Sequence, residues 1–171
     1  SPHLKNRLNL NLAEKKISLS SKGYPTNVFE KNSLRSNELI EMTMILSNLC
    51  VSQTLSQSIT KYRSRYHEIP DKHALKDLNI FTSLNDLATI RGNKVTSNSF
   101  NELLKQCKYP EKKELLSNFI LRILPKAKYS DVEVGHFGLN LPLYCHFTSP
   151  IRRYADLTVH RSLAFALNWE M

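Results

Sequence analysis

Residues 146–156 read HFTSPIRRYAD, and this stretch places a helix-starting signal directly beside two positive charges. Ser149 fits the N-cap position, where a side-chain oxygen accepts hydrogen bonds from free backbone N–H groups, and Pro150 fits the first helical position, which needs no N–H. The stretch therefore predicts a helix that begins at Ser149. Arg152 and Asp156 then lie four residues apart on one face of that helix.

Two physical interpretations of this helix start are open. A helix N-terminus carries unpaired N–H groups and about half a positive charge, so two arginines in its first turn are unfavourable unless an anion binds there. In the first interpretation, a phosphate is held by Thr148, Ser149, the first-turn amides and one or both arginines. In the second, Arg152 pairs with Asp156 on a solvated face and Arg153 is free. On physical grounds alone, the ion pair is slightly favoured.

The composition indicates a basic chain that forms one domain or a piece of a larger one. The chain has 171 residues, and its apolar content of 41% is enough for a packed core. Lys and Arg number 24 against 15 Asp and Glu, which leaves a formal net charge of +9. That charge favours a polyanionic partner, nucleic acid before an acidic membrane surface, although a lysine-rich surface that only aids solubility explains it equally well.

The apolar runs and the cysteines bear on the compartment of the protein. No apolar run approaches the roughly 20 residues that span a membrane, and the first residues lack the continuous apolar segment of a signal peptide. The three cysteines have no metal-ligand spacing, so we expect reduced, mostly buried thiols in a cytoplasmic protein without a membrane partner. These cysteines are Cys50, Cys107 and Cys145.

The clearest helix is predicted over about 36–60, with Ser36 as its N-cap. Its apolar residues recur at helical spacing, and we expect them to form one buried stripe. Glu41 lies beside this stripe and faces away from its centre. The residues of the stripe are Leu39, Met42, Ile45, Leu46, Leu49 and Cys50.

The rest of the pattern predicts an α+β fold with a mainly helical body. Asp71 is expected to start a second helix, and two further helical patterns cover about 97–107 and 111–124. The strands are expected to be short, because alternation of apolar and polar residues lasts only a few positions at a time. They are predicted in three places, within 8–20, within 63–71 and near 141–147.

A longer stretch carries a family resemblance. Residues 135–161, GHFGLNLPLYCHFTSPIRRYADLTVHR, closely resemble the signature of the RNB catalytic domain of ribonuclease R and ribonuclease II, which are processive 3′-to-5′ exoribonucleases. Three upstream stretches support the resemblance, which spans about residues 8–168. The stretch RYHEIPD favours ribonuclease R over ribonuclease II. The three stretches are SNELIEMTMILSN (36–48), RYHEIPD (65–71) and LPKAKYS (124–130).

The resemblance implies roles for individual residues. Arg152 matches the arginine that contacts the scissile phosphate and stabilises the charge that develops on it. Glu41 matches a glutamate that contacts the 3′-terminal nucleotide, where a carboxylate suits the ribose 2′-OH, although by itself it reads as a solvent-facing helix residue. Arg65 and His67 stay open between a structural role and a channel role. The other residues expected to contact RNA are Thr148, Ser149, Arg153, Tyr154, Tyr129 and His146.

The aromatic members of this set have an alternative role. Tyr129, His146 and Tyr154 can line an RNA channel by stacking or by phosphate contact, and His136 belongs to the same class. Packing in the core, with the polar tips satisfied by hydrogen bonds, explains each of them at least as well.

The family chemistry also implies a metal requirement. Hydrolysis of a phosphodiester by two metal ions needs clustered carboxylates to hold Mg²⁺, and the family carries these as a tight aspartate cluster. This chain has five aspartates, none of which is adjacent to another or in a D-x-D arrangement. We therefore expect no metal ligands in this chain and Mg²⁺ ligands elsewhere in the parent enzyme.

These points lead to one expected domain assignment. Residues 1–171 are expected to be the C-terminal portion of an RNB exoribonuclease catalytic domain, without the aspartate-cluster half and without the OB-fold RNA-binding modules. The short strands would then complete a sheet with the missing half of the domain. Such a piece is expected to expose apolar surface and strand edges, and it can associate as a fragment dimer.

Three hypotheses for the function remain after the sequence has been read. In the first, the parent protein hydrolyses single-stranded RNA processively from the 3′ end to nucleoside 5′-monophosphates with Mg²⁺, and this piece is inactive alone. The alternative is a degenerate RNB-like protein that binds RNA without cutting it. The third is a basic helical interaction domain with no RNA role.

Overall fold

The structure is a computed structural model that describes residues 6–10, 12, 15–30, 34–58, 61–90 and 95–169. It confirms the α+β class with a mainly helical body. The elements in chain order are β1 (Lys15–Leu19), β2 (Pro25–Glu30), α1 (Arg35–Ser56), β3 (Ser64–Tyr66), α2 (Lys72–Leu84), α3 (Ser97–Gln106), α4 (Pro110–Ile123), β4 (Lys128–Ser130), the 3₁₀ helix η2 (Phe137–Leu139) and α5 (Tyr154–Ala166).

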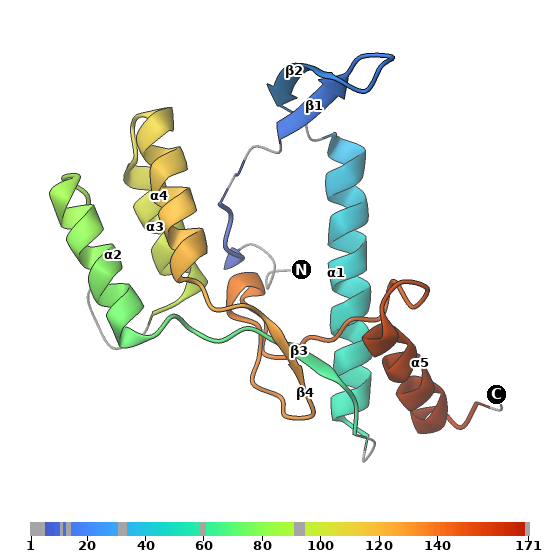
Figure 1. The fold of residues 1–171 in the computed structure, drawn as a ribbon. Coiled ribbons are helices and arrows are strands. Elements are labelled where there is room, and N and C mark those ends of the chain that lie inside the picture. Colours follow the sequence, from blue (N-terminus) through green and yellow to red (C-terminus); the bar gives the residue numbers. More distant parts are fainter. Residues whose placement is uncertain are drawn as a thin grey trace.

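The elements form two helical regions joined by a small sheet (Figure 1). Helices α2, α3 and α4 lie together on one side of the molecule, and the long helix α1 stands on the other side with α5 beside its C-terminal half. Strands β3 and β4 lie between the two regions, and the β1–β2 hairpin projects beyond the N-terminal end of α1. No helix in the described ranges has the length and apolar character that a membrane span requires.

Each helical region has its own apolar core. The core of the α2–α4 region includes Leu78, Phe100 and Leu116, which are all fully buried, and the rings of Phe81 and Phe119 stack beside it at 4.6 Å. On the other side, α1 and α5 meet through smaller clusters that pack against the segment leading into α5. These clusters contain Ile45, Leu49, Leu141 and Tyr144 in one case and Leu55, Tyr62, Cys145, Val159 and Leu163 in the other.

The start of α2 confirms the prediction, whereas the start of α1 does not. The side chain of Asp71 accepts a hydrogen bond from the Ala74 N–H at 2.7 Å and caps α2 as expected. Helix α1 begins at Arg35 after an N-cap residue, Leu34, that makes no side-chain hydrogen bond. Ser36 therefore lies inside the first turn, and its assignment as the N-cap was wrong.

Helix α1 buries only part of the predicted stripe. Ile45 and Leu49 are buried, but Leu39 is 67% exposed, and Leu46 and Cys50 are exposed as well. The prediction was wrong for these three residues. The N-terminal half of α1, which contains Leu39, has no neighbouring helix beside it (Figure 1), and Leu46 and Cys50 are exposed although they lie in the other half. The face that is buried there also contains polar residues, namely Asn48 and Ser52.

The strands differ from the prediction in extent. β1 lies within 8–20 as expected, and it pairs antiparallel with β2, a strand outside the predicted ranges. β3 pairs antiparallel with β4, and Arg65 lies opposite Tyr129. The segment 141–147 forms two isolated bridges instead of a strand, through Leu141 and Cys145.

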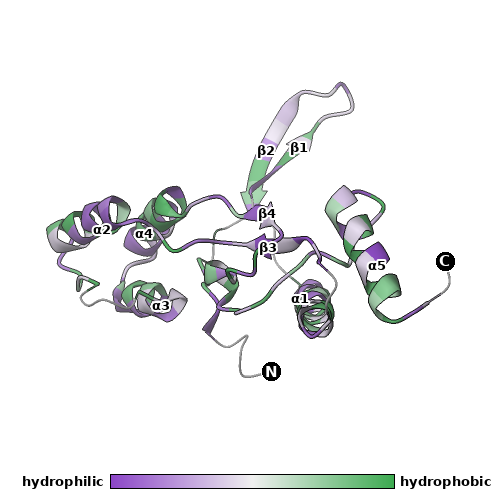
Figure 2. Ribbon diagram, turned by 90° about the horizontal axis from the view of Figure 1, so that it is seen from below, coloured by the Kyte–Doolittle hydropathy of each residue, from purple (hydrophilic) through white to green (hydrophobic). Residues whose placement is uncertain are grey.

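Apolar side chains are exposed in several places, as the sequence led us to expect. They lie on both strands of the β1–β2 hairpin, on the N-terminal half of α1, on α5 and in the segment before α5. Figure 2 shows that the projecting hairpin contains hydrophobic residues. An unpacked hairpin with apolar residues on its strands is unusual for a surface element. The residues concerned include Ile17, Leu19, Val28, Phe29, Leu39, Ile40, Ile151 and Phe165.

Candidate functional site

The segment Ser149–Arg153 is a turn, and α5 begins only at Tyr154. The predicted helix start at Ser149, with Pro150 as the first helical residue, was therefore wrong. The cause is the side chain of Asp156, whose Oδ1 accepts a hydrogen bond from the Ser149 N–H at 2.8 Å. This contact folds the chain back over the first turn of α5. We call residues 148–153 the arginine loop.

A buried ion pair closes the base of the arginine loop. Arg153 Nη2 donates to Asp156 Oδ1 at 2.7 Å, and the side chains are 26% and 0% exposed respectively. The pairing of Arg152 with Asp156, with Arg153 free, was therefore wrong, because the two arginines have exchanged roles. A carboxylate that is buried away from water must be stabilised by hydrogen bonds or by a cation, and Arg153 supplies both.

A buried amide on α1 fixes the chain that leads into the loop. Asn48 Oδ1 accepts from the N–H groups of Phe147 and Thr148 at 2.9 and 3.3 Å, and its Nδ2 donates to the Tyr144 hydroxyl at 2.9 Å. From α5, the ring of His160 stacks on Phe147 with 4.0 Å between centroids, and its Nε2 lies 2.8 Å from the Phe147 carbonyl oxygen. Two helices thus hold the backbone that enters the loop.

The loop presents polar groups that have no partner among the described residues. Arg152 is exposed, and within the described part of the chain its guanidinium makes no hydrogen bond or ion pair. The hydroxyls of Thr148 and Ser149 are likewise without a described hydrogen bond and are half-buried beside it. An exposed guanidinium on a firmly held backbone is suited to bind a phosphate bidentately.

Tyr129 and His146 come together behind the loop. The Tyr129 hydroxyl lies 2.7 Å from His146 Nδ1, and the Arg65 guanidinium lies over the Tyr129 ring at 4.6 Å from its centroid. Burial, and after it the charge of Arg153, lowers the pKa of His146 to about 4. His146 is therefore neutral near pH 7, and it orients Tyr129 instead of offering a positive charge to RNA.

His67 and His136 hold the glycine-containing turn upstream. The N–H of Gly138 donates to His67 Nδ1 at 3.0 Å, and the N–H of Leu139 donates to His136 Nδ1 at 3.2 Å. A Cβ at Gly138 would lie only 3.0 Å from His67 Nδ1, so a larger residue there would have to displace the imidazole by a few tenths of an ångström. Burial lowers the pKa of His136 to about 3, and the neighbouring His67 adds to this shift. These contacts give both histidines a structural role.

Glu41 and the candidate metal ligands are not joined to the loop. The Glu41 carboxylate is exposed on α1 and pairs with Arg7 Nη1 at 2.8 Å, and no described contact links it to Arg152. Within the described ranges there is no group of three or more His, Cys, Asp or Glu side chains able to hold a metal ion. Asp156 is engaged by Ser149 and Arg153, so the carboxylates described do not fit a Mg²⁺ site.

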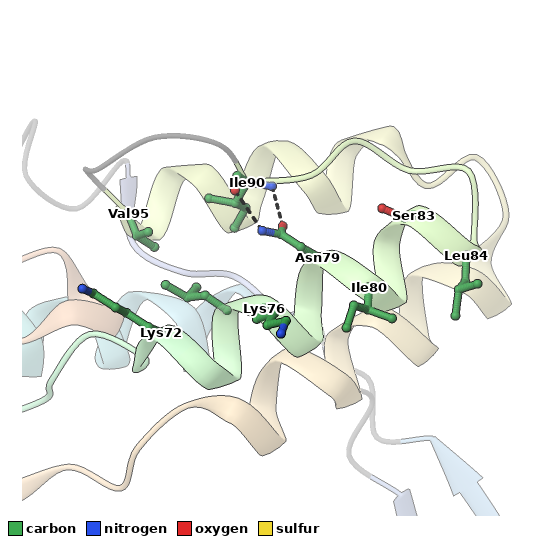
Figure 3. Close-up of a pocket in the computed structure, with 9 residues that line it drawn as sticks. Lys72, Lys76, Asn79, Ile80, Ser83, Leu84, Ile90 and Val95 are labelled. Carbon is green, nitrogen blue, oxygen red and sulfur yellow. Dashed lines mark hydrogen bonds between the residues drawn. The ribbon is translucent and has the colours of Figure 1, made fainter.

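A separate groove lies on α2, away from the loop (Figure 3). It has a volume of about 550 Å³, and Lys72 and Lys76 stand over an apolar lining that includes Ile80 and Ile90. The amide of Asn79 is used within the fold, since it accepts from the Ile90 N–H at 2.8 Å and donates to the Ile90 carbonyl at 3.1 Å. The described lining contains no carboxylate or imidazole.

Comparisons with known proteins agree with the fold. A family model described as the RNB domain matches residues 3–168. The chain therefore belongs to the RNB domain family, a family of exoribonucleases, and the resemblance read from the sequence is confirmed.

Several of the similar proteins are ribonucleases R. The chain is 34% identical to ribonuclease R of Buchnera aphidicola over 86% of this chain and 20% of that protein. It is 35% identical to ribonuclease R of Escherichia coli over 77% of this chain and 16% of that protein. The structure of Mycoplasma genitalium RNase R in complex with ribose methylated single-stranded RNA matches with a TM-score of 0.87 and 29% identity, over 96% of this chain and 26% of that chain. The chain thus spans about a quarter or less of each of these proteins.

Proposed function

We propose that this chain is part of a processive, cytoplasmic 3′-to-5′ exoribonuclease that hydrolyses single-stranded RNA to nucleoside 5′-monophosphates with Mg²⁺. Residues 1–171 would be the C-terminal portion of its RNB catalytic domain. Membership of the RNB family supports the proposal, as does similarity to an RNase R that was solved with single-stranded RNA. The observation that carries it is the exposed Arg152 on a loop fixed from two helices.

In this proposal Arg152 contacts the scissile phosphate. Its guanidinium would stabilise the negative charge that develops on the phosphate oxygens, and the hydroxyls of Thr148 and Ser149 would donate hydrogen bonds beside it. Because the backbone of the loop is already fixed by Asn48 and Asp156, little conformational entropy is lost when the phosphate binds. Glu41 would contact the ribose of the 3′-terminal nucleotide.

The proposal assigns the metal ligands to a part of the protein outside this chain. The carboxylates that the structure describes do not cluster, and Asp156 is occupied by the arginine loop. We therefore expect the purified chain to bind RNA but not to cut it. Hydrolysis of a 5′-labelled single-stranded RNA by the purified chain, abolished by EDTA, would contradict this expectation.

RNA binding is tested by fluorescence anisotropy of a labelled single-stranded oligo-A RNA across a salt series. Arg152→Ala is expected to weaken binding by about tenfold, because one charge-assisted phosphate contact is lost. Arg122→Ala on α4 is the matched control, since it removes the same charge from an exposed position in the other helical region. Binding that is equal in the two variants would refute the assignment of Arg152.

The exposed apolar surface supports a second part of the proposal. We propose that the N-terminal half of α1 and the β1–β2 hairpin are covered by the other half of the same catalytic domain. Without that half, the same surface can bring two copies of this chain together as a dimer. Size-exclusion chromatography with light scattering tests this point, and a monomer with no concentration dependence would count against the dimer.

A degenerate RNB-like protein that binds RNA without nuclease activity is the alternative. The reading frame upstream of Ser1 distinguishes these two hypotheses, because an aspartate cluster there would support the enzyme. A start codon directly before this chain, together with RNA binding that is lost in Arg152→Ala, supports the binding protein instead.

A further inference from the structure

A groove lies between the small β3–β4 sheet and the first two turns of α5. It has a volume of about 460 Å³, which is within the range of about 300–1,000 Å³ that is typical for sites holding one small ligand. The groove lies directly beside the arginine loop, because three of its lining residues, Arg153, Tyr154 and Ala155, directly follow Arg152 in the chain. The residues that line it are Arg63, Tyr129, Arg153, Tyr154, Ala155 and Thr158.

Two tyrosine rings line this groove, and they differ in their contacts and in their exposure. Tyr129 is fixed, since its hydroxyl contacts His146 at 2.7 Å and Arg65 covers its ring, yet 38% of the side chain stays exposed. Tyr154 is 72% exposed, and its hydroxyl has no hydrogen bond among the described residues. Aromatic faces that remain accessible in a groove are suited to stack with a base, because every base has a π-face.

The charge of the groove comes from one arginine. The charge of Arg153 is compensated by the buried carboxylate of Asp156 at 2.7 Å. Arg63 is exposed and has no ion pair or hydrogen bond among the described residues. Its backbone position is well defined, because the next residue, Ser64, is buried and donates its hydroxyl to the carbonyls of Ser130 and Val132. Arg63 thus leaves one uncompensated positive charge at the edge of an aromatic groove.

We propose that this groove binds one nucleotide of a single-stranded RNA, with a phosphate on Arg63 and a base against the rings of Tyr129 and Tyr154. A cation together with accessible aromatic rings matches the two parts of a nucleotide, and neither feature alone would select it. This inference rests on the proposed function, because it places a neighbour of the nucleotide that Arg152 contacts. Arg63 is then a further RNA-binding residue, which the sequence did not single out.

The test uses the full 171-residue chain and labelled oligo-A RNA in anisotropy titrations across a salt series. Arg63→Ala is expected to weaken binding about tenfold and to lower the slope of log K against log salt by about one, as expected for one lost phosphate contact. Arg122→Ala, the exposed control on α4, is expected to stay within about twofold of the wild-type chain. In a second readout, 2-aminopurine in the RNA is expected to be quenched by stacking, and Tyr154→Leu is expected to relieve that quenching.

The outcomes separate this inference from the proposed function. Weaker binding and a lower salt slope in Arg63→Ala, with quenching relieved in Tyr154→Leu, support the groove. If Arg63→Ala matches Arg122→Ala while Arg152→Ala loses affinity, the groove is refuted and the proposed function stands. If the wild-type chain does not bind RNA even at low salt, both are refuted. Circular dichroism of each variant confirms that the exposed substitutions leave the fold unchanged.

Discussion

The two helical regions of this molecule are stabilised in different ways. The core of α2, α3 and α4 is a set of apolar side chains, and a polar residue buried beside it, Thr82, bonds within its own helix. Around the arginine loop, in contrast, the buried Asn48 bonds to backbone about a hundred positions away, and the buried Asp156 bonds to the backbone of the loop itself. An apolar core specifies how helices pack, whereas buried polar groups with directional bonds specify the position of one loop.

The largest effect is expected where the buried ion pair is broken. Asp156→Asn keeps the shape of the side chain but leaves the Arg153 guanidinium without its counter-charge, and breaking a buried pair typically costs about 3–5 kcal/mol. We expect the free energy of unfolding, measured by urea denaturation, to fall by about 4 kcal/mol. Asp77→Asn on the exposed side of α2 is the control. A loss below about 1 kcal/mol would remove the distinction between the two regions.

The apolar core of the α2–α4 region is tested by Leu116→Ala. Leu116 is fully buried, and a Leu→Ala change in a core costs about 2–5 kcal/mol because it removes apolar contacts and leaves a cavity. We expect a loss of about 3 kcal/mol in the free energy of unfolding. Leu115→Ala, at the exposed neighbouring position, is expected to cost less than about 1 kcal/mol.

The same variant sharpens the comparison through RNA binding. If the two regions are independent, the folded fraction of Leu116→Ala keeps wild-type affinity for oligo-A RNA, since the arginine loop is fixed by α1 and α5 alone. Weaker RNA binding by fully folded Leu116→Ala would mean that packing in the α2–α4 region also positions the loop.

A third prediction concerns the amide that fixes the entrance to the loop. Asn48→Ala leaves the N–H groups of Phe147 and Thr148 buried without an acceptor, which costs about 1–3 kcal/mol. We expect the free energy of unfolding to fall by about 2 kcal/mol and hydrogen exchange at these two amides to become faster. Asn118→Ala, at an exposed position of α4, should change neither quantity. Unchanged exchange at both amides would show that Asn48 does not hold the loop.

The contrast between the regions also explains what the sequence predicts. The helices of the α2–α4 region follow from apolar periodicity and from local signals such as Asp71, because these signals lie only a few residues apart in the chain. The predicted start of α5 was wrong because Asp156 accepts a hydrogen bond from the Ser149 N–H. This bond competes with the helical turn that Ser-Pro favours. The predicted burial of the N-terminal half of α1 was wrong because periodicity identifies an apolar face but does not reveal what covers it.

Some site residues can likewise be recognised in the sequence, whereas the roles of others become clear only in the fold. The family resemblance marks the arginine loop as one unit, but only the fold shows that Arg153 faces Asp156 while Arg152 is exposed. Asn48 has no signal in the sequence, since a polar residue within a helix reads as solvent-facing. Its role depends on contacts that span about a hundred positions of the chain, which no local pattern records.

A change in stability is also expected from pH, and it acts on the histidines between the two regions. The unfolded chain binds a proton at each histidine near pH 6.5, whereas burial holds the pKa of His136 at about 3 and that of His146 at about 4. Their folded pKa values are depressed, so the stabilisation is complete above about pH 6.5 and is lost as the pH falls below it. Each group contributes up to about 1.4 kcal/mol per pH unit in that window.

This pH dependence is measured by urea denaturation between pH 7 and pH 5. His136→Gln should make the dependence shallower by about one proton, because the glutamine side chain does not titrate. His73→Gln, at an exposed position of α2, should leave the slope unchanged. If His136→Gln leaves the slope as steep as in the wild-type chain, the buried imidazole is not what makes the junction between the regions sensitive to acid. The acid sensitivity would then have to come from another group, and His146→Gln measured over the same range would test the second buried imidazole.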